Sequence, residues 1–385
     1  MSMRCIRVTA PKEPLVYLED EKIPKAPDGG AVVKVSHCGV CHTDVQFWEG
    51  GYSLGDGTEL KFQDRPGFVY PCIPGHEIAG ILYTMDENTS KNSNESDLKL
   101  GDRVVICPWI DCNACRPCKM GYNIFCDGSP PVYIGMTQDG GFAQYVAVPD
   151  LRYLVPVSEF IPPPIASLLP CSGLNAYHAV EEAMEFVKTV TEIRGGCSVL
   201  TFGAGGVGQW AVRLARALFP PETQIICAEV KQQPLDLVTS NVSDVVPLLM
   251  ARGESSESVA ERVKAASRTG TGVDLVLDFV GATQTFQTAN KLLRKRGRYH
   301  VAGLLGGQAQ FPLANMVLKG ITMKGIKVGS LNQLRRLVQL LADMPSLYAN
   351  LQYEVHPLED GISVFEKLAK GEVVGRAVLR CNGDE

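Results

Sequence analysis

The sequence predicts an α/β protein in which a β-rich first part is joined to a doubly wound parallel sheet. Before Gly195, short alternating runs such as 31–35 are separated by glycine and proline turns, a pattern typical of β-structure. After Gly196, short apolar strands alternate with helical stretches, which favours a parallel sheet built from βαβ crossovers. Four cysteines between residues 112 and 126 interrupt the β-rich part and indicate a small metal-binding lobe.

The composition is that of an ordinary globular protein with enough sequence for two or three domains. The 385 residues are 45% hydrophobic and 21% charged, which is sufficient apolar material for a large core. The net charge of -5 and the lack of a basic block argue against nucleic acid as a partner. No apolar run approaches the roughly 20 residues that a membrane helix needs, and residues 1–8 resemble a β-strand rather than a signal peptide. We therefore expect a cytoplasmic protein without a membrane partner.

The first half of the chain is expected to alternate between strands and loops. β-Structure is predicted for residues 1–40, 101–106, 140–148 and 154–157. The segment 50–74, rich in glycine, proline and aromatic residues, is predicted to be a long surface loop. The polar segment 86–99 is predicted to be an exposed, mobile loop. Three prolines at 162–164 precede a predicted helix that holds Cys171.

The second half of the chain predicts the parallel sheet and the closing elements. Strands are expected at residues 198–202, 225–228, 274–280 and 298–302. A helix follows from the apolar spacing of Leu331, Leu334, Leu337, Val338 and Leu341. A second helix at 358–370 leads to a final strand at 376–379.

The lobe cysteines Cys112, Cys115, Cys118 and Cys126 carry the strongest metal signal in the chain. Four thiolates this close can complete a tetrahedral shell around zinc with no open position, which is a structural site. Disulfides would need an oxidising compartment, and an iron–sulfur cluster is the other alternative for four thiolates. The chain has 13 cysteines, and we expect the seven outside metal patterns to be buried core residues: Cys5, Cys38, Cys72, Cys107, Cys197, Cys227 and Cys381.

A second metal pattern is spread over three fragments. The stretch 39–44 contains Cys41, the fragment 75–77 contains His76, and the fragment 170–173 contains Cys171. Together these three residues would form a Cys2His site with one open position. Such a site is catalytic, because four-coordinate zinc with three protein ligands leaves room for water or substrate.

The segment 203–208 is a G-x-G-x-x-G element that follows an apolar strand and opens a helix, the context that dinucleotide binding requires. In it Gly203 allows a tight turn, Gly205 lets the backbone approach a pyrophosphate, and Gly208 lets the helix pack on the strand. Gly206 and Val207 complete the turn, whose helix N-terminus would bind the phosphates. Glu229, 21 residues beyond Gly208, would accept hydrogen bonds from the adenosine ribose.

Coenzyme selectivity depends on the same carboxylate. A negative charge at Glu229 repels a 2′-phosphate, so NAD is favoured over NADP, although the cation Lys231 would partly tolerate a phosphate. The alternative for Glu229 is an ordinary solvated surface charge.

These elements resemble the zinc-dependent alcohol dehydrogenases of the medium-chain dehydrogenase/reductase superfamily. The Gly75-His76-Glu77 element, the segment 101–104 (Gly-Asp-Arg-Val), the cysteine lobe and the glycine-rich turn occur in the family's order. The resemblance implies a GroES-like catalytic domain at residues 1–171 with its lobe at about 107–127. It also implies a Rossmann domain at 172–327 and a return to the catalytic domain at 328–385.

The resemblance also implies roles for individual residues. Cys41, His76 and Cys171 look like the catalytic zinc ligands, Glu77 like a nearby acidic residue that joins the metal site, and Asp44 like the carboxylate that orients the ligand histidine. Thr43 resembles the hydroxyl that binds the substrate alcohol and accepts its proton. His42 and Arg376 resemble phosphate contacts, and Trp48 and Trp109 fall at substrate-pocket positions, with core packing as the alternative. Two positions depart from the family pattern: Gln46 replaces a proton-relay histidine, and Asn175 replaces a threonine at the nicotinamide.

The function that the resemblance implies is reversible oxidation of a primary or secondary alcohol with NAD and two zinc ions per chain. A polyol dehydrogenase is the alternative within the superfamily, but such enzymes commonly have glutamate as third ligand, and Cys171 favours the simple alcohol branch. A non-catalytic NAD-binding protein is the alternative from another class. The resemblance implies a homo-oligomer, dimer or tetramer, with the segment 326–329 as a candidate interface.

Overall fold

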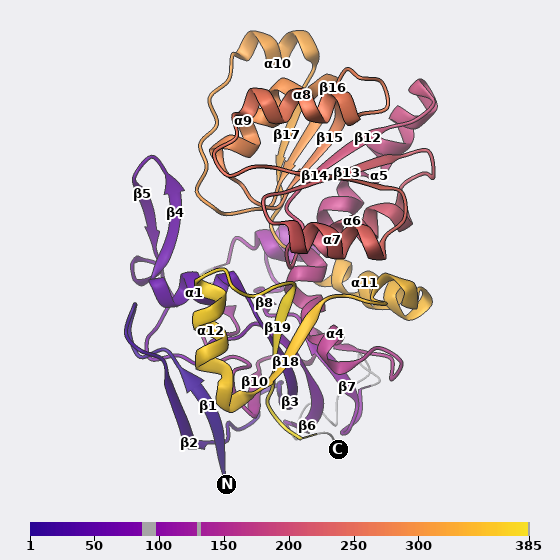
Figure 1. Cartoon of the computed structure of the whole chain (residues 1–385). Helices are drawn as coiled ribbons and strands as arrows, with labels where there is room; N and C mark the ends of the chain where they lie inside the picture. The colour runs from indigo at the N-terminus through magenta and orange to yellow at the C-terminus, as the bar shows by residue number, and fades with distance from the viewer. Residues whose placement is uncertain (87–97, 129–131, 384–385) are drawn as a thin grey trace.

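The computed structural model describes residues 1–86, 98–128 and 132–383, and its two largest sheets lie at opposite ends of the molecule (Figure 1). In Figure 1 the parallel sheet and its helices form the upper half, while strands from both ends of the sequence form the lower half. Both termini lie at the bottom of that lower half. The predicted α/β fold, with a β-rich part and a doubly wound part, is confirmed.

The lower half is organised around a seven-stranded sheet. Its order is β11 (Leu154–Pro156), β7 (Arg103–Ile106), β6 (Glu77–Met85), β3 (Ala31–Val40), β19 (Arg376–Arg380) and β18 (Tyr353–Pro357), with β10 (Tyr145–Val148) also pairing β3. The long strand β3 is almost wholly buried, and β19 lies antiparallel to it, pairing Ala377 with Val40. A two-stranded sheet of β1 (Ser2–Arg7) and β2 (Val16–Lys22) lies beside it. The last strand of the chain is therefore an internal strand of the first sheet.

The upper half contains a six-stranded parallel sheet. Its order is β14 (Val245–Leu249), β13 (Gln224–Glu229), β12 (Ser198–Phe202), β15 (Val273–Asp278), β16 (Leu293–Val301) and β17 (Thr322–Gly325). Numbered by sequence, this order is 3-2-1-4-5-6, which is the doubly wound arrangement that binds dinucleotides where the strand order reverses. The associated helices are α6 (Gly208–Leu218), α7 (Gln232–Asn241), α8 (Ser256–Ala266), α9 (Thr283–Leu292) and α10 (Leu313–Lys319).

A long helical segment connects the two halves. It begins as α4 (Pro163–Leu168), passes through one π-helical turn at Leu169–Gly173, and continues as α5 (Leu174–Arg194). Pro170 has no backbone N–H, so the ordinary helical hydrogen bond cannot form at its position. Single π-turns of this kind occur frequently at functional sites. The predicted helix holding Cys171 is confirmed, and Cys171 lies in its wide turn.

The prediction of a long surface loop at 50–74 is wrong. The segment contains a hairpin of β4 (Gly51–Gly55) and β5 (Thr58–Lys61) and a 3₁₀ turn at Phe62–Asp64. Phe62 and Phe68 are buried and stack with ring centroids 4.6 Å apart, because aromatic side chains gain more from burial than from exposure. In Figure 1 the hairpin stands alone at the left of the molecule. The polar loop predicted at 86–99 falls mostly on 87–97, outside the described residues.

The remaining elements complete both halves. They are α1 (His42–Glu49), β8 (Trp109–Ile110), α3 (Arg116–Lys119), β9 (Val132–Tyr133), α11 (Leu331–Asp343), α12 (Gly361–Ala369) and 3₁₀ turns at Asn123–Phe125, Leu151–Tyr153, Pro345–Leu347 and Leu358–Asp360. The helix predicted around 331–341 is α11, and its five diagnostic residues are all buried. All seven cysteines expected in the core are buried and free. Within the described ranges, no helix is long and apolar enough to cross a membrane.

Candidate active site and metal centres

The first fragment of the site is the start of α1. Cys41 is the N-cap residue, and its backbone N–H donates to Asp44 Oδ2 at 2.9 Å. Asp44 is fully buried and also accepts the Gly75 N–H, with 3.2 Å between Gly75 N and Asp44 Oδ1. One buried carboxylate therefore fixes the two fragments that carry Cys41 and His76.

His76 lies between Asp44 and Cys171. Its Nδ1 is 2.8 Å from Asp44 Oδ1, and its Nε2 is 3.3 Å from Cys171 Sγ. Burial alone lowers the pKa of His76, but the Asp44 carboxylate and then Cys41 outweigh it and raise that pKa well above the ordinary value. A ring that donates Nδ1–H to a carboxylate presents Nε2 as a metal ligand, and the carboxylate increases its basicity.

The predicted ligand set Cys41, His76 and Cys171 is brought together. Its ligand atoms, with that of Glu77, all lie within 4.8 Å of one another. The Cys171 hydrogen bond is the main cause that lowers the pKa of Cys41, and the same bond raises the pKa of Cys171. Two neighbouring thiols beside an oriented imidazole match the soft and borderline donors that zinc prefers. The donor set therefore fits a three-ligand zinc centre.

Glu77 and Arg376 form a buried ion pair next to this cluster. Arg376 Nη2 binds Glu77 Oε2, and the Ser172 N–H donates to Glu77 Oε1 at 3.1 Å. Burial raises the pKa of Glu77 to about 7 against the opposing charge of Arg376. Both Glu77 oxygens are thus engaged by other groups, which leaves Cys41, His76 and Cys171 as the better ligands.

Arg376 also reaches the dinucleotide turn, as its predicted phosphate role requires. A Cβ on Gly206 would lie 2.4 Å from Arg376 Cδ, so the arginine packs directly on this glycine. Burial first, and then the charges of Arg376 and Lys231, lower the pKa of His42 against the opposing charge of Cys41. Arg376 and Lys231 therefore supply positive charge near a bound pyrophosphate, and the lowered pKa of His42 favours a neutral imidazole beside them.

The glycine-rich turn has the geometry of a phosphate loop. Gly203 has a φ of +95°, and a Cβ on Gly208 would lie 1.9 Å from Gly203 O, so neither position accepts a side chain. A Cβ added to Gly205 would meet no heavy atom of the described structure within 4 Å. The open space at Gly205 and the helix α6 behind it fit a bound pyrophosphate.

Glu229 ends β13, as predicted, and its carboxylate holds the turn. Its Oε2 accepts the Ala204 N–H at 2.8 Å, and its Oε1 accepts the Val230 N–H at 2.7 Å. Lys231 Nζ donates to Gly371 O at 2.6 Å, which draws this cation toward the other half of the molecule. Asn175 Oδ1 is buried without a hydrogen-bond partner in the part of the chain that the structure describes. That orphaned acceptor fits the carboxamide N–H of a nicotinamide.

Thr43 has a neighbour that sequence reasoning missed. The Tyr52 hydroxyl from β4 lies near it: burial raises the pKa of Tyr52, and the Thr43 side chain opposes that shift. The Tyr52 ring packs edge-on against Phe62 at 5.0 Å between centroids. Gln46 follows on α1, partly buried. A hydroxyl beside Thr43 is therefore present although the relay histidine is absent, and only the aromatic content of 50–74 pointed to it.

The two tryptophans predicted for the substrate pocket have different surroundings. The Trp109 ring lies 5.6 Å from the His76 ring, and its Nε1 donates to Pro170 O at 3.4 Å. Trp48 instead packs edge-on against Phe365 and donates Nε1–H to Glu13 O at 2.6 Å. Trp109 thus adjoins the metal cluster, whereas the contacts of Trp48 follow the core-packing alternative.

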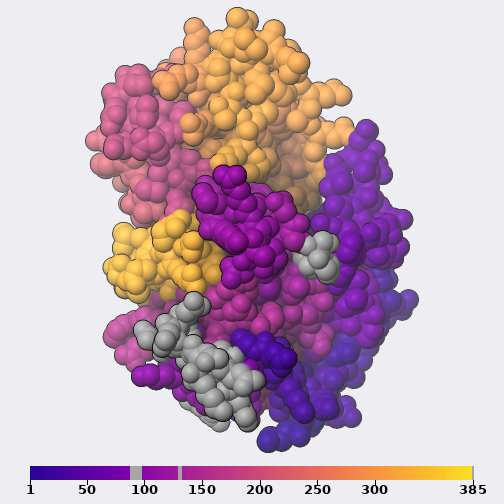
Figure 2. All heavy atoms as spheres, turned by 180° about the vertical axis from the view of Figure 1, so that it is seen from behind, coloured from indigo at the N-terminus to yellow at the C-terminus, as the bar shows by residue number. Residues whose placement is uncertain are grey.

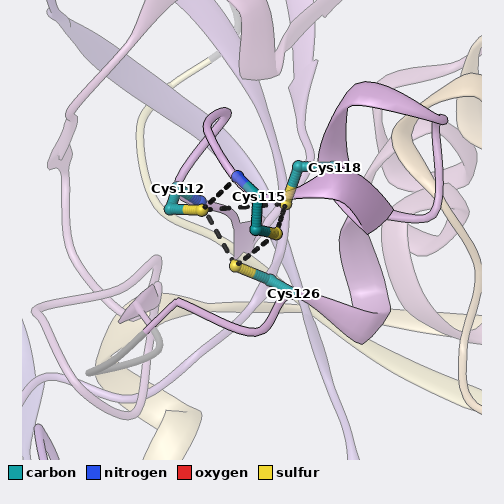
Figure 3. A group of neighbouring side chains, drawn as sticks. All are labelled: Cys112, Cys115, Cys118 and Cys126. Carbon is teal, nitrogen blue, oxygen red and sulfur yellow. Dashed lines mark hydrogen bonds between the residues drawn. The ribbon is translucent and has the colours of Figure 1, made fainter.

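The cysteine lobe forms a second cluster (Figure 3). The Sγ atoms of Cys115 and Cys118 are 3.2 Å apart, and those of the pairs Cys112–Cys118 and Cys115–Cys126 are 4.0 Å apart. Four sulfurs at about 2.3 Å from one zinc ion would be about 3.8 Å apart, whereas a disulfide needs about 2.05 Å. All four cysteines are free. Their spacing fits a single tetrahedral zinc ion with no open position.

The lobe is fastened to the region between the two halves. Asn123 Oδ1 accepts the Leu331 N–H at 2.9 Å, and Ile124 O accepts from Lys327 Nζ at 2.7 Å. The Cys115 N–H, and then that of Ala114, lower the pKa of the Cys112 thiol to about 6, which favours the thiolate. A metal-held lobe therefore supports the start of α11 and the segment before it.

Comparison with known proteins identifies the family of the chain. Residues 27–159 match the alcohol dehydrogenase GroES-like domain, which confirms the GroES-like fold, and residues 206–343 match the zinc-binding dehydrogenase family. The NAD-dependent alcohol dehydrogenase of Sulfolobus acidocaldarius is 33% identical over 96% of each chain, and an alcohol dehydrogenase of Rhizobium meliloti is 30% identical over the full length of both. The crystal structure of the alcohol dehydrogenase from Aeropyrum pernix superposes with a TM-score of 0.80 at 27% identity, covering 98% of this chain and 99% of that one. The chain therefore belongs to the zinc-dependent alcohol dehydrogenases of the medium-chain dehydrogenase/reductase superfamily.

Proposed function

We propose that the chain oxidises primary or secondary alcohols to aldehydes or ketones, reversibly, with NAD as hydride acceptor and one zinc ion in each of its two cysteine-containing clusters. The observation that carries this proposal is the position of Arg376. It binds Glu77 beside the three-ligand cluster and packs on Gly206 of the phosphate loop. One side chain thus joins the metal ligands to the coenzyme turn, as hydride transfer between adjacent sites requires.

The chain's own residues supply orientation and a proton path. Bound zinc would polarise the alcohol oxygen and lower its pKa, and bound NAD would accept the hydride. Cys41, His76 and Cys171 would hold the metal, and Asp44 fixes the His76 ring at 2.8 Å. Thr43 Oγ1 would accept the proton that leaves the alcohol, and the Tyr52 hydroxyl, its neighbour, would in turn take a proton from Thr43.

A panel of primary, secondary and aromatic alcohols tests this proposal. Purified protein with zinc should form NADH from at least one of them, and NADP should be the poorer acceptor because of Glu229. Zinc content by atomic absorption should be two ions per chain. No NADH from any alcohol, in protein that contains zinc and binds NAD, would favour the non-catalytic alternative. A clear preference for polyols would favour the other branch of the superfamily.

We also propose a cytoplasmic location. All thirteen cysteines are free, and seven of them are buried small core residues rather than disulfide partners. Free thiols in this number suit a reducing compartment.

We further propose a homodimer formed through α10 and the edge strand β17. Residues 326–329, the candidate interface from the sequence, are engaged within the chain: Ile326 is buried and Lys327 binds Ile124. By contrast, no residue of α10 is buried, and Leu313, Val317 and Leu318 are 73%, 77% and 80% exposed. Among the described strands, β17 pairs only with β16, so its other edge is available. A second copy related by a two-fold axis would cover both features.

Charging this helix should produce monomers. The double variant Val317→Glu/Leu318→Glu should sediment at the mass of one chain in analytical ultracentrifugation, because burying two carboxylates at an apolar interface is costly. The matched control is Ile193→Glu, which changes another 62% exposed apolar residue, at the end of α5. Equal sedimentation of the wild type and the double variant would contradict this interface.

A further inference from the structure

A cavity of about 460 Å³ lies beside Trp109, between the lobe and the segment that follows β17. Its walls come from three separate parts of the sequence. Arg65 belongs to the segment after the β4–β5 hairpin, Phe125 and Tyr133 belong to the lobe region, and Lys327 follows β17. In Figure 2 the purple lobe projects between the orange residues above it and the violet residues at its side. The volume of the cavity suits a small ligand.

Two cations face this cavity without a carboxylate partner. Neither Arg65 nor Lys327 has an ion pair within residues 1–86, 98–128 and 132–383. Lys327 Nζ gives one hydrogen bond, to Ile124 O, and lies 5.9 Å from the Phe125 ring centroid. The Arg65 guanidinium lies 5.7 Å from the Phe68 ring centroid. Both head groups therefore keep hydrogen-bond donors for a ligand.

The two positive charges also act on each other. Burial first, and then the charge of Arg65, lower the pKa of Lys327. Like charges in one partly enclosed cavity repel each other, and an anion bound between them would remove that repulsion.

Two residues that can carry negative charge, Asp127 and Cys126, also line this cavity. Asp127 lines it, but its side chain is exposed and forms no ion pair with either cation in the described structure. Cys126 also lines the cavity, and the negative charge of its sulfur raises the pKa of Lys327 against the effects of burial and Arg65. A role for Lys327 in balancing the thiolates of the lobe is therefore the competing explanation, and it predicts effects on zinc content rather than on substrate choice.

The cavity adjoins the catalytic cluster through one side chain. Trp109 lines the cavity and lies 5.6 Å, between ring centroids, from His76. Its Nε1 binds the carbonyl of Pro170, which precedes Cys171. Trp109 therefore belongs both to the cavity wall and to the surroundings of the metal ligand His76.

We infer that Arg65 and Lys327 bind an anionic oxyacid group, a carboxylate or a phosphate, at the far end of the substrate alcohol. The inference rests on the proposed alcohol oxidation and adds the substrate class: hydroxy acids or phosphorylated alcohols in preference to neutral ones. Arg65 offers a planar fork and Lys327 a point charge, a pair suited to either group. Trp109, Phe125 and Tyr133 would line the path of the carbon chain.

Matched substrates test the inference on the zinc-loaded enzyme. Initial rates are compared for 4-hydroxybutanoate, its methyl ester, butan-1-ol and 3-hydroxypropyl phosphate. We expect kcat/KM for at least one anionic alcohol to exceed that for the neutral pair roughly 10- to 100-fold, the usual effect of hydrogen bonds to charged groups. The acid and the phosphate arms distinguish the two sources of negative charge. Added salt should reduce the preference.

Two charge-removing variants assign the effect to the cavity. Lys327→Met and Arg65→Gln should each remove most of the preference for the anion and leave kcat/KM for butan-1-ol unchanged. Lys119→Met is the matched control, because Lys119 belongs to the same lobe but does not line the cavity. Zinc content should stay at two ions per chain in all three variants.

The outcomes separate this inference from the proposed function. Oxidation of butan-1-ol at least as efficient as that of every anionic alcohol would overturn the inference and leave the proposed function intact. Loss of zinc from Lys327→Met with unchanged substrate choice would assign the cation to the lobe and also overturn it. If no alcohol is oxidised, calorimetric titration with butanoate still decides, since the wild type should bind it and the Arg65→Gln/Lys327→Met double variant should not. Equal binding by both proteins would overturn the inference.

Discussion

Replacing Cys41 or His76 by alanine should abolish alcohol oxidation while NAD still binds. Each substitution removes one of three ligand atoms from a cluster no wider than 4.8 Å. The loss of Lewis-acid polarisation is worth several kcal/mol, or a fall in kcat of roughly 10³-fold or more. The glycine-rich turn belongs to the other half of the molecule and should be unaffected. Stopped-flow kinetics and NAD titration measure the two effects separately.

The matched control for this experiment is Cys38→Ala. Cys38 is as deeply buried as Cys41 and lies three residues before it on β3, but it is not part of either ligand cluster. Its variant should keep its zinc and most of its activity. Undiminished alcohol oxidation by Cys41→Ala or His76→Ala would be incompatible with the proposed function.

Replacing Cys112 or Cys115 by alanine should unfold the lobe and remove one zinc ion per chain. Structural zinc sites contribute roughly 10–16 kcal/mol of apparent binding free energy in small peptides, which rivals the stability of a whole domain. The lobe has little apolar material of its own, and Met120, Tyr122 and Phe125 are exposed. Limited proteolysis between residues 112 and 126, with metal analysis, measures the loss.

Loss of the lobe should also reduce activity, since Asn123 of the lobe accepts the Leu331 N–H at the start of α11. Cys107→Ala is the control, because Cys107 is buried at the start of the lobe and is not a ligand. Its substitution should cost about 1 kcal/mol, the usual effect of one core change. A Cys112→Ala protein that keeps two zinc ions and resists proteolysis would refute a structural role for the metal.

Much of the fold was predictable because its elements produce patterns among residues that are close in sequence. The glycine-rich turn between a strand and a helix requires small residues at fixed spacing, so it identifies the doubly wound half without reference to distant residues. The lobe ligands Cys112, Cys115, Cys118 and Cys126 lie within 15 residues, so they too form a local pattern that can be recognised without distant residues. Leu331 to Leu341 show the helical period because one face of α11 is buried.

Other parts of the site had no such local signal. Tyr52 meets Thr43 only because the β4–β5 hairpin folds beside α1, and hairpins with long irregular flanks have no fixed periodicity. Arg65 and Lys327 are more than 250 residues apart, and each alone resembles an ordinary surface charge. The double role of Arg376, at Glu77 and at Gly206, depends on how the last strand enters the first sheet. Long-range pairing of this kind is decided by tertiary packing, which sequence spacing does not encode.

The internal position of β19 has a consequence for the order in which the protein acquires its structure during synthesis. The strands of the parallel sheet all lie between residues 198 and 325, so that sheet can close its hydrogen bonds once this continuous segment has left the ribosome. The first sheet cannot do so, because β18 reaches it only through β19, which ends at Arg380. Cys41 and Cys171 are made before the parallel sheet, but Arg376, which links their neighbour Glu77 to the coenzyme turn, is made after it. The nascent chain therefore holds its metal ligands long before it can have a complete active site.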